Sequence, residues 1–85
     1  MSDHDPADDA FTLDTLKAAV DNQITDGHPR EAGLVMLALT SQGVERDAAL
    51  AMMADVLAEH IGRAMDKDQP FDINAYAKDL LGLSS

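Results

Sequence analysis

The feature that most constrains this chain is the spacing of its apolar residues, which follows a helical period in four separate segments. A recurrence every three or four residues places apolar side chains on one face of an α-helix, whereas a half-buried β-strand shows strict alternation, which is found nowhere here. The patterns cover residues 13–24, 29–42, 45–66 and 73–81. The sequence therefore predicts an all-α fold, a compact four-helix domain over residues 11–85.

Residues that cap or interrupt helices bound these segments. Thr12 and Asp72 stand where N-cap residues are expected, before the first and last helices. Pro29 is placed at the first helical position of the second. Three glycines are expected to end helices: Gly27, Gly43 and Gly82. The short connections predict antiparallel neighbours.

The longest helix, residues 45–66, carries two lines of interest. Leu57 and Ile61 belong to its predicted core stripe, with His60 at the edge. Ala54, Ala58 and Gly62 stand four residues apart, and such a line of small residues would let a second helix approach closely.

Charged residues are distributed unevenly along the chain. There are 16 acidic residues against 6 Lys and Arg, a formal charge of −10 over 85 residues. The first ten residues hold four acids and no large apolar residue after Met1. We expect residues 1–10 to be a disordered acidic arm whose removal leaves the melting temperature nearly unchanged.

Composition also excludes several classes of function. The acidic charge argues against binding nucleic acid or an anionic membrane through a basic surface. No apolar run approaches the ~20 residues of a membrane span, and the acidic start is unlike a signal peptide. The absence of Cys excludes disulfides and thiolate ligands. A cytoplasmic protein is the expectation.

No metal or other cofactor is expected. The histidines share no i,i+4 spacing. Residues 66–72 begin like a calcium loop, but Phe71 and Ala77 occupy the positions of its glycine and closing glutamate. One possibility stays open: without Met1, the terminus Ser2-Asp3-His4 offers an amine, two amides and an imidazole to Cu(II) or Ni(II).

The chain offers few of the residues and motifs that catalysis requires, and we do not expect it to be an enzyme. There is no Cys, no Gly-rich phosphate loop, and no Ser in a nucleophile motif. His60 has two interpretations: a buried base, or a core-edge histidine hydrogen-bonded to a carbonyl or carboxylate. The second is favoured because no partner catalytic group is evident.

The second half of the chain combines paired Met, a proline in the polar link and a Tyr in the last helix, in the residues Ala49, Met52, Met53, Leu57, Pro70, Asp72, Tyr76 and Leu80. In this pattern it resembles a small uncharacterised family of bacterial all-helical domains. The resemblance covers roughly the last forty residues, and Ile61 stands where that pattern has an aromatic residue. It implies the helical fold and transfers no activity or site.

The leading functional hypothesis is a non-enzymatic interaction module that acts by protein–protein contact, with an unknown protein or with itself as a homodimer. The alternative is an acidic regulator or nucleic-acid mimic that occupies a basic protein surface. Self-association is suggested by the second helix, which is apolar on two opposite faces, although the first helix could instead cover the second face. The predicted interface residues are Leu34, Leu37, Ala38, Ala54, Ala58 and Gly62.

Overall fold

The computed structural model describes residues 12–84 of the chain. In this part of the chain, four helices follow one another: α2 (Leu13–Asp26), α3 (Arg30–Ser41), α4 (Arg46–Asp66) and α5 (Ile73–Leu83). The same residues form no β-strand. The prediction of an all-α four-helix fold is confirmed, while the predicted arm, residues 1–10, lies outside the described residues.

The helix starts follow the predicted capping. The Thr12 hydroxyl accepts a hydrogen bond from the Thr15 backbone amide at 3.3 Å, and the Asp72 carboxylate accepts from two amides at the start of α5. Each cap satisfies amides that have no partner within the helix. Pro29 differs from its predicted place, since its extended ψ of 148° puts it just before α3.

Two of the three predicted helix ends are confirmed. Gly27 and Gly43 have φ of 71° and 95°, in the left-handed region that glycine adopts without steric cost. The prediction for Gly82 is wrong, because α5 continues to Leu83. A glycine near a helix end costs only about 1 kcal/mol. Just beyond this end of α5, the Gln42 side chain donates to the Ser84 carbonyl at 3.1 Å.

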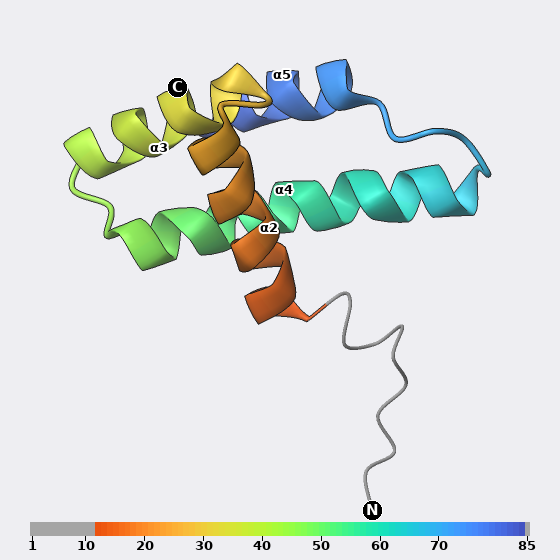
Figure 1. Ribbon diagram of the computed structural model, residues 1–85, viewed down its shortest axis with the longest axis horizontal. Coiled ribbons are helices and arrows are strands. Elements are labelled where there is room, and N and C mark those ends of the chain that lie inside the picture. Colours follow the sequence, from red (N-terminus) through yellow and green to blue (C-terminus); the bar gives the residue numbers. More distant parts are fainter. Residues whose placement is uncertain (1–11, 85) are drawn as a thin grey trace, which may run out of the picture.

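The helices are arranged around α4, which packs against each of the others (Figure 1). In this view α2 crosses in front of α4 at a steep angle, and α3 and α5 lie together above α4. The chain runs along α3, returns along α4 and runs forward again in α5. Therefore α3 and α5 are parallel, with Gln42 and Ser84 adjacent at their carboxyl ends.

The core fills the space between these helices. Leu57 is buried in it, as predicted, whereas Ile61 is only partly buried and packs against its edge. No helix among the described residues has the length and hydropathy needed to cross a membrane. The buried apolar side chains of the core cluster are Leu16, Val20, Ala32, Val35, Met36, Leu39, Ala49, Leu50, Met53, Ala54, Leu57, Tyr76 and Leu80.

Candidate functional site

Three exposed leucines lie on the neighbouring helices α3 and α5, and this set, Leu34, Leu37 and Leu81, is here named the α3–α5 face. Their side chains are 50%, 66% and 42% exposed. The opposite side of α3 is buried in the core. The prediction that this helix is apolar on two faces is confirmed, and α2 packs against α3 without covering Leu34 or Leu37.

The parallel arrangement brings these leucines to the same level. Gln42 and Ser84 fix the register at the carboxyl ends of α3 and α5. Counting back from this pair, Leu81 lies about 4.5 Å and Ala38 about 6 Å along their helices. Leu81 is therefore level with the turn of α3 that holds Leu37 and Ala38. Leu81 could not be assigned to this face from the sequence, because that assignment depends on which helix α5 packs against.

The three predicted interface residues on α4 behave differently. Ala54 is fully buried in the core, so its assignment to an interface is wrong. Ala58 and Gly62 are exposed, and no atom lies within 4 Å of the position that a Gly62 Cβ would take. In the part of the chain that the structure describes, no second helix therefore packs closely against Gly62. A helical wheel shows which residues share a face of a helix, but it does not show which neighbouring helix covers that face.

Net charge is absent from the two helices that carry this face. α3 contains only Arg30 and Glu31 as charged residues, and α5 only Lys78 and Asp79. The full −10 of the chain therefore belongs to the other segments. On those segments, Lys17 pairs with Asp47 and Arg46 with Asp21, which links α2 to α4.

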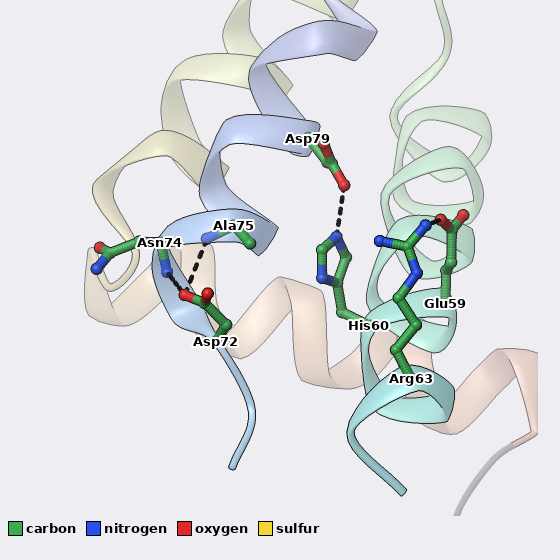
Figure 2. Close-up of polar contacts among 7 residues, drawn as sticks. All are labelled: Glu59, His60, Arg63, Asp72, Asn74, Ala75 and Asp79. Carbon is green, nitrogen blue, oxygen red and sulfur yellow. Dashed lines mark hydrogen bonds and ion pairs between the residues drawn. The ribbon is translucent and has the colours of Figure 1, made fainter. Parts of the chain in front are cut away.

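His60 occupies a second site, between α4 and α5. It is 6% exposed, and its Nε2 lies 2.6 Å from a carboxylate oxygen of Asp79 (Figure 2). The predicted position at the core edge and the hydrogen bond to a carboxylate are confirmed, while the choice between a structural histidine and a buried base stays a prediction. Asp79 could not be identified as the partner from the sequence, because the pairing depends on how α5 lies against α4.

Two aromatic rings pack against His60. The rings of Phe71 and Tyr76 meet it edge to face, with centroids 6.3 and 5.9 Å away. The Tyr76 hydroxyl donates to the Gln23 side-chain oxygen at 2.7 Å, which ties α5 to α2. Burial raises the pKa of Tyr76 to about 12, although the hydrogen bond to Gln23 acts in the opposite direction.

The open side of His60 faces a cavity of about 170 Å³ between the last turns of α4 and the link to α5. Arg63 and Lys67 line it from α4, and Gln69 and Asp72 from the link. Residues 12–84 contain no cluster of three His, Cys, Asp or Glu side chains suited to hold a metal ion. The terminus Ser2-Asp3-His4 lies outside this range.

Comparisons with protein-family models, with curated proteins and with solved structures give no match to this chain. The resemblance of its second half to small bacterial helical domains therefore stays a prediction. Within the described residues, the candidate sites are the α3–α5 face and the surroundings of His60.

Proposed function

We propose that this protein acts by protein–protein contact rather than by catalysis, and that its contact surface is the α3–α5 face. The observation that carries the proposal is the exposure of Leu34, Leu37 and Leu81 on two adjacent parallel helices. Burying apolar surface yields about 25 cal/mol per Å². We infer that the three exposed leucines of these two packed helices act as one contact patch, unlike scattered single residues.

The proposed partner is a second copy of the chain, related by a two-fold axis. Two copies with a charge of −10 repel each other over most approaches. α3 and α5 carry no net charge, so this face is where two copies meet with the least repulsion. A two-fold contact sets the same surface against itself, which lets the leucines of one copy cover those of the other.

Light scattering during size exclusion tests this proposal. The native protein is expected to run as a dimer that dissociates on dilution, and Leu37→Glu is expected to give a folded monomer with unchanged helical circular dichroism. Because Leu37 is 66% exposed, a charge there should not disturb the core.

Met65→Glu is the matched control, since Met65 is 65% exposed in the last turn of α4, away from this face. It should remain a dimer. A native protein that stays monomeric at every concentration, or equal dissociation of both variants, would contradict the proposal.

The acidic-regulator alternative rests on the net charge. A nucleic-acid mimic needs a row of free acids on one face, but Asp21, Asp47 and Glu59 are engaged in ion pairs on α2 and α4. Under this alternative, a basic partner would bind Leu37→Glu as well as the native chain and would be released by salt. For the contact module we propose a cytoplasmic location.

A further inference from the structure

The cavity beside His60 has features that the contact function does not use. Its wall on α4 is one helical face: His60, Arg63, Ala64 and Lys67 follow at intervals of three, one and three residues. Ala64 is the short member of this row, and its small side chain leaves space between the longer ones. At about 170 Å³ the cavity is close to the ~150 Å³ that holds a benzene-sized molecule.

The His60 ring presents one nitrogen to this cavity. Its Nε2 is held by Asp79, while its Nδ1 has no hydrogen-bond partner among the described residues. Every fully buried side-chain nitrogen and oxygen in that part of the chain has a partner, so Nδ1 must be reached by solvent. In Figure 2 this nitrogen lies on the side of the ring toward Asp72 and Ala75, and both of these residues line the cavity.

Positive charge gathers at the same place. The whole chain has six Lys and Arg residues, and two of them, Arg63 and Lys67, line this one cavity. Arg63 also bonds Glu59, whereas Lys67 forms no ion pair with residues 12–84. The carboxylate in the wall is Asp72, whose Oδ1 already accepts two backbone amides. In an acidic protein, this concentration of donors calls for an explanation.

We propose that the cavity binds a small oxyanion of the phosphate or sulfate type, or the phosphate group of a phosphomonoester. Arg63 and Lys67 donate charge-assisted hydrogen bonds to it, and protonated His60 donates from Nδ1. Asp79 accepts from Nε2 and balances the imidazolium charge. The five heavy atoms of such an anion suit a cavity of this size, and its open side leaves room for an organic substituent.

Protonation of His60 controls this binding. When the imidazole is neutral and donates from Nε2 to Asp79, Nδ1 carries a lone pair that repels an anion. Binding is therefore expected to strengthen as the pH falls. The other charged or titratable groups around the ring and the cavity are Asp79, Tyr76, Asp72, Arg63 and Lys67.

The experiment is a titration of the full chain followed by ¹⁵N and imidazole ¹H NMR. Sodium sulfate is the probe, since its charge does not change between about pH 5 and 8, and sodium chloride at equal ionic strength is the reference. Saturable shifts are expected at His60, Gln69 and Ala75 at about pH 5, and at least tenfold weaker binding at about pH 8. Phenyl phosphate and inorganic phosphate, compared at one pH, distinguish an organic phosphate from the free ion.

Two matched variants make the result specific. Lys67→Gln removes a charge from the cavity wall and is expected to weaken sulfate binding about tenfold. Lys78→Gln removes the same charge from an exposed position on α5 outside the cavity and should leave binding nearly unchanged. Both residues are exposed, so the fold tolerates both changes. Equal weakening by the two variants, or shifts no larger than those with chloride, would overturn the proposal.

Discussion

Replacing Tyr76 with phenylalanine is expected to destabilise the protein at neutral pH and to stabilise it in strong alkali. At neutral pH the change removes the hydrogen bond to Gln23, worth about 1 kcal/mol. The cost stays modest because Gln23 is only partly buried and water can reach its side chain. The aromatic ring and its packing against His60 and Phe71 are kept.

The effect reverses because burial raises the pKa of Tyr76 from 10.0 to about 12. In the unfolded chain the phenol ionises near its ordinary pKa, so between pH 10 and 12 unfolding gains a favourable deprotonation that the folded protein resists. Stability is full below pH 10 and falls as the pH rises toward 12. At about 1.4 kcal/mol per pKa unit, the loss reaches about 3 kcal/mol in the native protein. The phenylalanine variant lacks this loss.

Urea unfolding of both proteins across this pH range measures the difference directly. Lysine deprotonation contributes equally to both proteins, so subtraction isolates Tyr76. The native protein should be about 1 kcal/mol more stable at neutral pH and about 2 kcal/mol less stable above pH 12, with a crossing between. Tyr76 is the one tyrosine in the chain, so phenolate absorbance reports its ionisation without ambiguity. Ionisation of the folded protein near pH 10, or curves that never cross, would refute this reasoning.

Four further changes test the packing and the backbone by urea unfolding. Leu57→Ala should cost about 2–5 kcal/mol because Leu57 is buried in the core, and a near-silent change would contradict that position. Gly62→Ala should stabilise α4 by about 1 kcal/mol, since a Cβ there meets nothing within 4 Å; destabilisation would mean that an unseen neighbour packs on it. Gly43→Ala, where φ is 95°, serves as the opposite control and should destabilise. Asp72→Ala should cost about 1 kcal/mol by removing the α5 cap, while an unchanged stability would show that water replaces it.

Local signals in the sequence were sufficient for the helices themselves. Their positions follow from apolar period, and Thr12, Gly27 and Gly43 bound them through interactions within a few residues of the chain. Such contacts join residues that are close in sequence, so they can be predicted from the sequence alone. The end of α5 is the exception, because the bond between Gln42 and Ser84 joins residues far apart in sequence.

Candidate sites were predictable only in part. Leu34 and Leu37 were recognised as a second apolar face, and their exposure now shows that α2 does not cover them. Leu81 could join them, and Ala54 could leave the predicted interface, only after the packing of the helices was known. A helical wheel fixes which side chains share a face, but the same wheel is compatible with several neighbours for each face.

The sequence by itself determined four helices, most of their caps and a core stripe on each, because these features arise from the period of the helix and from backbone hydrogen bonds at its ends. Tertiary structure alone decided that α3 and α5 lie parallel, that His60 meets Asp79, and that Arg63 and Lys67 face one cavity. Each of these depends on the direction in which whole helices pack. That direction is set by the summed burial of many side chains, so it cannot be predicted from any single residue of the sequence.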